Sequence, residues 1–289
     1  MKRLAGLVLA ATLAVAAGPA SAAVKLVAAE NFYGSLAHAI GGLQVEVVSV
    51  LNNPDQDPHL FETSPAVARQ VADARIVILN GAGYDSWMAK LLTAAPRPQR
   101  TVIVVADLMH AKAGDNPHLW YDPATMPAVA RALTAALAKT DPDHASDYGA
   151  RLATTLASLA RVEARVKALR DKWAGTPVTA TEPIFGPMAD ALGLAMRNQS
   201  FQRAVMNDTE PSASDVARFE DDLKNNKVKA LLYNKQVTDK LTDHLIAIAK
   251  KAKVPVVAVT ETQPADTAYE DWMLSELNAL DQALTGAPQ

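Results

Sequence analysis

The sequence has 289 residues, of which 49% are hydrophobic and 20% charged, a composition typical of one large globular domain or two ordinary ones. Acidic residues outnumber basic ones by 31 to 28, a balance that argues against nucleic acid or an anionic membrane surface as a partner. Because cysteine is absent, neither a disulfide nor a lipid on an N-terminal cysteine is expected.

Residues 1–22 have the three regions of a secretory signal peptide. A basic start at Lys2 and Arg3 precedes an apolar run, and small residues up to Ala22 suit a signal peptidase. A membrane anchor is the alternative, but the apolar run is short for a span of about 20 residues. Removing Lys2 and Arg3 leaves 26 basic against 31 acidic residues, a net charge of −5. We therefore expect cleavage near Ala22 and a soluble periplasmic protein with no direct membrane insertion.

The first half of the mature chain alternates short strands with helices. The predicted strands are residues 24–28, 45–50, 75–79 and 101–105, and two of the predicted helices are 65–74 and 86–94. Such alternation implies a parallel sheet covered by helices. We expect residues 23–140 to form an N-terminal α/β lobe.

Residues 141–175 are predicted to form one long connecting helix. Asp141 and Pro142 are suited to its start, and Gly175 to its end. Apolar residues recur every three or four positions from Tyr148 to Trp173, which gives one apolar stripe. The helix would be about 48 Å long at 1.5 Å per residue, enough to lie along two lobes. A coiled-coil helix in a dimer is the alternative, but the flanking lobes need a surface to pack on, so we expect a monomer.

The second half repeats the strand pattern. Residues 177–180, 228–233 and 255–259 are predicted strands, and residues 195–200 are the candidate for a fourth. Residues 176–289 should therefore form a C-terminal α/β lobe. The predicted fold class is α/β, with two lobes of parallel sheet joined by one spine helix and a cleft between them.

Two matching tripeptides end in histidine. Asp57-Pro58-His59 and Asn116-Pro117-His118 each follow a predicted strand and lie in a polar loop. The proline limits the directions in which the imidazole can point, and imidazole is the commonest side-chain ligand for divalent transition metals. One loop histidine is usually only solvated, but two in the same context make His59 and His118 candidate metal ligands.

Carboxylates follow two strands of the second half. Glu182 lies just beyond residues 177–180, and Asp266 lies in the loop beyond 255–259. Ligands of open α/β sheets bind at the carboxyl ends of strands, which makes both acids candidate metal ligands. Each also has an ordinary structural explanation, because Glu182 could be an acid at a helix N-terminus and Asp266 a helix cap. Glu261 is the competing carboxylate in the last loop.

Three longer motifs resemble the metal-binding receptors of bacterial manganese and zinc ABC transporters. They are Asp57-Pro58-His59-Leu60-Phe61-Glu62-Thr63-Ser64-Pro65, Asn80-Gly81-Ala82-Gly83-Tyr84-Asp85-Ser86-Trp87 and Asn116-Pro117-His118-Leu119-Trp120-Tyr121-Asp122-Pro123. The resemblance extends over the whole mature chain and implies two α/β lobes joined by one long helix.

The same resemblance implies a ligand set. His59 and His118 match the two ligands of the N-terminal lobe, and Glu182 falls where zinc-type members often have histidine and manganese-type members glutamate. Asp266 falls on the family's aspartate of the C-terminal lobe. The chain departs from the pattern in lacking the histidine-rich loop of many zinc-type members, and Asn234 stands where many members have an acid.

These features predict a binding protein that captures Mn²⁺ or Zn²⁺ as cargo and delivers it to an ABC transporter permease. A set of two imidazoles and two carboxylates closes around an ion, whereas a catalytic metal keeps a position open for water. A secreted metal-dependent hydrolase is the alternative, but no His-Glu-x-x-His or Gly-x-Ser-x-Gly motif is present. Glu182 is the reason to favour manganese slightly, because a carboxylate is a harder ligand than imidazole.

Overall fold

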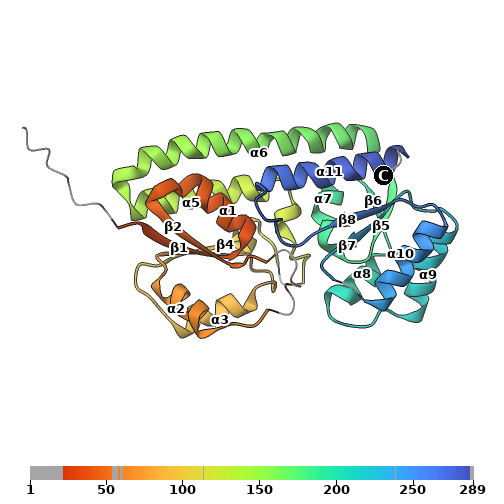
Figure 1. Cartoon of the computed structure of the whole chain (residues 1–289), viewed down its shortest axis with the longest axis horizontal. Coiled ribbons are helices and arrows are strands. Elements are labelled where there is room, and N and C mark those ends of the chain that lie inside the picture. The colour runs from red at the N-terminus through yellow and green to blue at the C-terminus, as the bar shows by residue number, and fades with distance from the viewer. Residues whose placement is uncertain (1–21, 54–57, 59–60, 113, 238, 287–289) are drawn as a thin grey trace, which may run out of the picture.

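Two parallel four-stranded sheets, one in each half of the chain, form the framework of the computed structural model (Figure 1). The structure describes residues 22–53, 58, 61–112, 114–237 and 239–286. Residues 1–21 of the expected signal peptide therefore lie outside it. Within the described ranges, no helix combines the length and the apolar character needed to cross a membrane.

Both sheets have the same topology. The first has the order β2-β1-β3-β4 and the second the order β6-β5-β7-β8, with every neighbouring pair parallel. The strands are β1 (Val24–Glu30), β2 (Val45–Leu51), β3 (Ile76–Leu79), β4 (Thr101–Val104), β5 (Pro177–Ala180), β6 (Ala195–Arg197), β7 (Leu231–Asn234) and β8 (Val256–Val259). The predicted α/β class with two parallel sheets is confirmed.

Helices cover the sheets. They are α1 (Asn31–Gly41), α2 (Pro65–Asp73), α3 (Ser86–Ala94), α4 (Val105–Leu108), α5 (Thr125–Thr140), α6 (Ala145–Trp173), α7 (Gly186–Ala191), α8 (Gln199–Met206), α9 (Ala213–Lys224), α10 (Lys240–Lys251) and α11 (Tyr269–Thr285). The candidate strand 195–200 is shorter than expected: β6 ends at Arg197, and Asn198, with φ 58°, turns the chain into α8.

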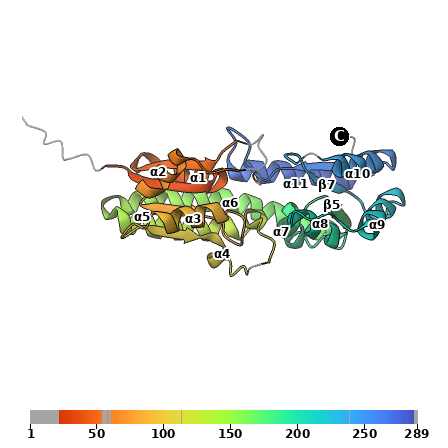
Figure 2. The same cartoon turned by 90° about the horizontal axis from the view of Figure 1, so that it is seen from below.

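The long helix is present and runs along both lobes, as Figures 1 and 2 show for α6. It begins later than predicted, after a 3-10 turn at Pro142–His144. The carboxylate of Asp141 does not cap this turn, because it accepts a hydrogen bond from the Tyr148 hydroxyl at 2.6 Å and pairs with Nδ1 of His144 at 2.7 Å. The helix ends before Gly175, whose φ of 79° suits the turn that follows.

The predicted apolar stripe of α6 faces the core. Its buried members are Tyr148, Leu159, Val162, Val166 and Leu169. The last helix, α11, lies beside α6, where Glu270 accepts a hydrogen bond from Ser158 at 2.6 Å and Asp281 accepts one from Trp173 at 2.8 Å. One cluster of buried hydrophobic residues extends through both lobes along these two helices. The lobes are therefore joined by a continuous core as well as by the polypeptide.

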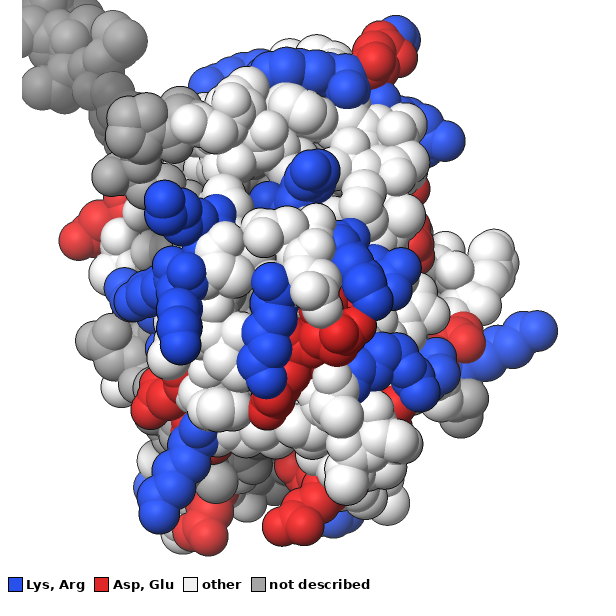
Figure 3. All heavy atoms as spheres, turned by 90° about the vertical axis from the view of Figure 1, so that its right-hand side faces the viewer, with Lys and Arg blue, Asp and Glu red and all other residues white. Residues whose placement is uncertain are grey.

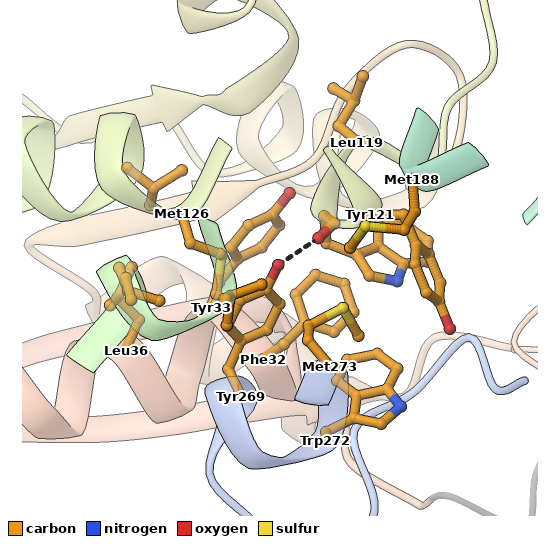
Figure 4. Close-up of a cluster of buried hydrophobic side chains, with 14 of the residues drawn as sticks. Phe32, Tyr33, Leu36, Leu119, Tyr121, Met126, Met188, Tyr269, Trp272 and Met273 are labelled. Atoms are coloured by element: carbon orange, nitrogen blue, oxygen red, sulfur yellow. Dashed lines mark hydrogen bonds between the residues drawn. The ribbon is translucent and has the colours of Figure 1, made fainter. Parts of the chain in front are cut away.

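Aromatic rings fill the junction between the lobes (Figure 4). Phe32 of α1 stacks on Trp120 with ring centroids 4.6 Å apart, and Tyr121 meets Trp272 of α11 edge to face at 5.8 Å. The hydroxyl of Tyr269 donates to the Trp120 carbonyl at 2.6 Å. This packing fixes residues 118–121 against the C-terminal helix, so the junction positions the loop that carries His118.

Charged side chains on the end face of the C-terminal lobe are of both signs (Figure 3). In this lobe, Lys224 pairs with Glu220 and Lys227 with Asp221, each at 2.5 Å, and three of these side chains are about half exposed. Exposed ion pairs contribute little to stability, because water and salt screen the attraction. The buried junction therefore contributes far more to holding the fold than these surface pairs.

Candidate metal centre

Polar residues that follow strands of both sheets meet at the lobe junction. His118 lies in the segment after β4, Glu182 follows β5, Asn234 ends β7 and Glu261 follows β8. All four side chains are buried. Parallel strands place their carboxyl ends at one edge of a sheet, and in this molecule the two edges face each other.

A tight turn after β3 supports the N-terminal half of the site. The carboxylate of Asp85 accepts hydrogen bonds from the backbone N–H of Asn80 at 2.6 Å and of Gly81 at 2.9 Å. Gly81, with φ 76°, permits this conformation, and an added Cβ would clash with Val104 and Ala106 at 2.9 Å. The amide of Asn80 then donates to the Pro117 carbonyl at 2.7 Å, so the turn holds the segment before His118.

The imidazole of His118 is held in one tautomer. Oδ1 of Asn116 accepts from the His118 backbone N–H at 3.1 Å and lies 2.7 Å from His118 Nδ1. Nδ2 of Asn116 donates to the carbonyl of Pro183 at 2.6 Å, so its oxygen faces the ring and Nδ1 must carry the proton. In the neutral ring the lone pair then lies on Nε2, for which no hydrogen-bond partner is found among the described residues. A neutral imidazole in this orientation is a metal ligand held ready by its neighbour.

One buried carboxylate of the C-terminal lobe, that of Glu261, lies close to this nitrogen, and a second, that of Glu182, is linked to it through Asn234. Oε2 of Glu261 lies 3.8 Å from His118 Nε2 and accepts a hydrogen bond from the Tyr84 hydroxyl at 3.0 Å. Nδ2 of Asn234 donates to Glu261 Oε1 at 2.6 Å and to Glu182 Oε2 at 3.0 Å. Burial beside Glu261 raises the pKa of Tyr84 well above its usual value, so Tyr84 remains a neutral donor. The arrangement therefore brings one imidazole nitrogen and two carboxyl groups together at the junction of the lobes.

The four expected ligands have different positions. His118 and Glu182 lie at the junction, whereas His59 falls outside the described residues. Asp266 is exposed, with φ 54°, and no hydrogen bond or ion pair between described residues connects it with His118 or Glu182. Over those same residues, no group of three histidine or acidic side chains is close enough together to hold a metal ion. The described geometry therefore brings Glu261, the competing carboxylate, to His118 instead of Asp266.

A cleft of about 300 Å³ connects the site with solvent. Tyr84, Asp115 and His118 line it from the N-terminal lobe. Residues 206–208, which end α8 and follow it, line the opposite side. His118 is thus almost entirely buried and yet borders a space that a small ion can enter.

Three supporting residues were not assigned roles from the sequence. Tyr84 and Asn116 stand within the motifs that carry the family resemblance, but nothing local indicates that they contact a carboxylate or an imidazole. Asn234 could have been found because it directly follows the predicted strand 228–233, whose carboxyl end lies at the same edge of the sheet as Glu182. Its contact with both acids depends on the order of the strands.

Comparison with known proteins places the chain among metal-binding proteins. Residues 26–283 match the family described as zinc-uptake complex component A, periplasmic. The high-affinity zinc uptake system protein ZnuA of Bacillus subtilis (strain 168) is 23% identical over 260 residues, which cover 82% of this chain and 80% of the relative.

Two solved structures share the fold. The periplasmic zinc binding protein TroA from Treponema pallidum superposes with a TM-score of 0.76 at 17% identity, over 91% of this chain and 99% of the other. The protein FpvC from Pseudomonas aeruginosa, in complex with Mn²⁺, superposes with a TM-score of 0.75 at 19% identity, over 91% and 99%. At these identities the likeness concerns the fold alone, and it extends over nearly the whole chain.

Proposed function

The chain belongs to the family of periplasmic zinc-uptake complex components, component A, and on this basis we propose that it captures a divalent transition metal ion in the cleft between its lobes. It delivers the ion to an ABC transporter permease from the periplasm, as a monomer whose signal peptide is cleaved near Ala22. The family consists of solute-binding proteins, and the ion is cargo. The supporting observation is the buried Nε2 of His118, which has no hydrogen-bond partner among the described residues and lies 3.8 Å from the carboxylate of Glu261.

Four side chains are proposed as ligands: His59 and His118 from the N-terminal lobe, and Glu182 and Glu261 from the C-terminal lobe. Glu261 replaces Asp266 in this set because Glu261 is fully buried beside His118, while Asp266 is exposed. Two neutral imidazoles and two carboxylates give a formal charge of −2, which a divalent ion neutralises. A buried pair of carboxylates without such an ion is electrostatically unfavourable, so the site favours a doubly charged cation.

The separation of 3.8 Å between His118 Nε2 and Glu261 Oε2 suits an ion placed between them. Bonds of about 2.1 Å to nitrogen and oxygen would place two donor atoms about 3.4 Å apart at a tetrahedral angle. A shift of a few tenths of an ångström would therefore complete this pair of contacts. The small size of that shift supports the assignment of both atoms to one ion.

Zinc and manganese are both proposed as cargo. The names of relatives include zinc uptake, and one structure of the same fold holds Mn²⁺. Zinc binds more tightly than manganese to most sites of nitrogen and oxygen ligands, while carboxylates reduce that advantage. With Glu182 and Glu261 both present, we lean slightly to manganese as the cargo in the cell.

Elemental analysis of the purified protein, followed by competitive titration against a chelator, tests the proposal. We expect one ion per chain in the wild type and a loss of affinity of at least about 100-fold in His118→Ala and in His59→Ala, since each removes a ligand. His244→Ala is the matched control, because His244 is exposed and pairs with Glu220 at 2.9 Å away from the junction. A wild type that binds no ion, or a His118→Ala protein that binds as tightly as the control, contradicts the proposal.

A further inference from the structure

Asn234 occupies the centre of the carboxylate cluster. It ends β7, which lies between β5 and β8 in the sheet order β6-β5-β7-β8. Glu182 follows β5 and Glu261 follows β8, so the two acids flank Asn234 at one edge of the sheet. A side chain at the end of the middle strand is the one that can reach both neighbours.

The amide of Asn234 is fixed in one orientation. Its Oδ1 accepts a hydrogen bond from the backbone N–H of Gln236 at 3.0 Å, which leaves Nδ2 facing the acids. Nδ2 carries two hydrogens, and it donates one to Glu261 Oε1 at 2.6 Å and one to Glu182 Oε2 at 3.0 Å. Asn234 is only 1% exposed, so water does not replace these bonds in the folded protein. The amide thus holds two carboxylates that would otherwise repel each other.

Gln236 extends the same support to the loop that carries Glu261. Its Oε1 accepts from the backbone N–H of Glu261 at 2.6 Å and of Thr262 at 3.0 Å. Its Nε2 donates to the hydroxyl of Thr262 at 2.7 Å. The loop after β8 is therefore fastened to the end of β7 through both its backbone and its side chains. Asn234 therefore contacts, in Glu261, a carboxylate whose backbone is already held.

We infer that Asn234 is a positioning residue for the metal ion, one that sets the direction of the Glu182 and Glu261 carboxylates without binding the ion itself. This inference rests on the proposed function and assigns a role to a residue outside the ligand set. Because the amide is neutral, it separates and orients the two carboxylates while leaving the formal charge of the cluster at −2, which matches a divalent cation. Polar groups that orient metal ligands in this way are typically worth about 10-fold to 100-fold in affinity.

Asn234→Leu removes both hydrogen-bond donors and keeps the branching of the side chain at Cγ. With Zn²⁺ as the probe and a competing chelator, we expect the affinity to fall about 10-fold to 100-fold. Gln202→Leu is the matched control, because Gln202 is another buried amide of this lobe, and it donates to the Arg197 carbonyl away from the acids. The control should lose stability but keep its affinity within about twofold. If Asn234→Leu does not fold, Asn234→Ala gives the same test without the larger side chain.

A double-mutant cycle separates positioning from a general loss of stability. In a Glu182→Ala background the amide has only Glu261 left to hold, so adding Asn234→Leu should reduce Zn²⁺ affinity several-fold less than in the wild type. Equal reductions in both backgrounds overturn the inference, as does an Asn234→Leu protein that binds Zn²⁺ as tightly as the wild type. If the wild type itself binds no Zn²⁺, the proposed function fails instead, so the two failures are distinguishable.

Discussion

Replacing Glu276 with glutamine should remove a pH dependence from the stability of the metal-free protein. Glu276 lies on α11 and is buried at the junction, where Oε1 accepts hydrogen bonds from Trp272 Nε1 at 2.8 Å and from the Thr260 backbone N–H at 3.2 Å. The hydroxyl of Tyr121 lies 2.8 Å from Oε2 and 2.7 Å from the Thr260 carbonyl. Burial raises the pKa of Glu276 from 4.5 to about 8, despite these donors.

The hydrogen bonds agree with a protonated carboxyl. The Tyr121 hydroxyl has one proton, so it cannot donate to both Glu276 and Thr260. If Glu276 carries a proton, it donates to Tyr121, and Tyr121 donates to the Thr260 carbonyl. Both hydroxyl protons, that of Glu276 and that of Tyr121, then have an acceptor. This neutral network joins the loop after His118 to the loop that carries Glu261.

The sign of the effect follows from the raised pKa. The folded protein retains a proton on Glu276 up to about pH 8, whereas the unfolded chain loses it near pH 4.5. Stability from this group is therefore fully present below about pH 4.5 and is lost as the pH rises to about 8. At about 1.4 kcal/mol per pH unit, this interval corresponds to a loss on the order of 5 kcal/mol. Glutamine cannot ionise, so Glu276→Gln should not show the loss.

Urea unfolding in the presence of a chelator measures this directly, because bound metal would add its own pH dependence. Glu30 and Asp85 also have raised pKa values from burial, so the wild type alone does not isolate Glu276. The difference in unfolding free energy between Glu276→Gln and wild type does isolate it. That difference should change in favour of the variant by several kcal/mol between about pH 5 and about pH 8.5. A difference that stays constant within about 1 kcal/mol over this range would refute a protonated Glu276.

Three further predictions concern the site and its supports. In competitive titration, Glu261→Gln should weaken Zn²⁺ binding at least about 10-fold more than Asp266→Asn, because only Glu261 is buried beside His118. The reverse order would identify Asp266 as the ligand instead of Glu261. Glu182→His should raise the ratio of zinc to manganese affinity, because imidazole is the softer ligand, and an unchanged ratio in a folded variant would remove Glu182 from the site. Asn31 forms two hydrogen bonds with the backbone of Gln263 across the lobes, so Asn31→Leu should lower the free energy of unfolding by about 2 kcal/mol. The variant should also release its ion faster in stopped-flow chelation. Release at the wild-type rate would show that this contact does not restrain the loop that carries Glu261 and Gln263.

The sequence determined the framework of this protein. Alternation of strands and helices in both halves predicted two parallel sheets, and the apolar stripe from Tyr148 to Trp173 predicted a long helix packed on both. These features are local or periodic, so they can be found without knowing which residues meet in space. His118 can likewise be singled out from local signals, namely the proline before it and its place after a predicted strand.

Which carboxylate meets His118 was decided only by the tertiary structure. Glu261 and Asp266 lie in one loop after the last strand, and the sequence favours Asp266 because it falls on the aspartate of the family that the chain resembles. In the fold, the chain directly after β8 is fastened by Gln236, so Glu261 points into the junction, while the left-handed turn at Asp266 leaves that side chain in solvent. Five positions along a loop cannot be separated by periodicity, since a loop has none.

The roles of Asn234 and Glu276 also depend on the tertiary structure. Asn234 reaches Glu182 and Glu261 because β7 is placed between β5 and β8, and strand order is not written in the spacing of residues along the chain. The pKa of Glu276 is raised because α11 buries this carboxyl group against Tyr121 from the other lobe. Local propensities and patterns decide which elements form, but the charge and direction of a buried side chain depend on neighbours distant in sequence, and only their packing brings these together.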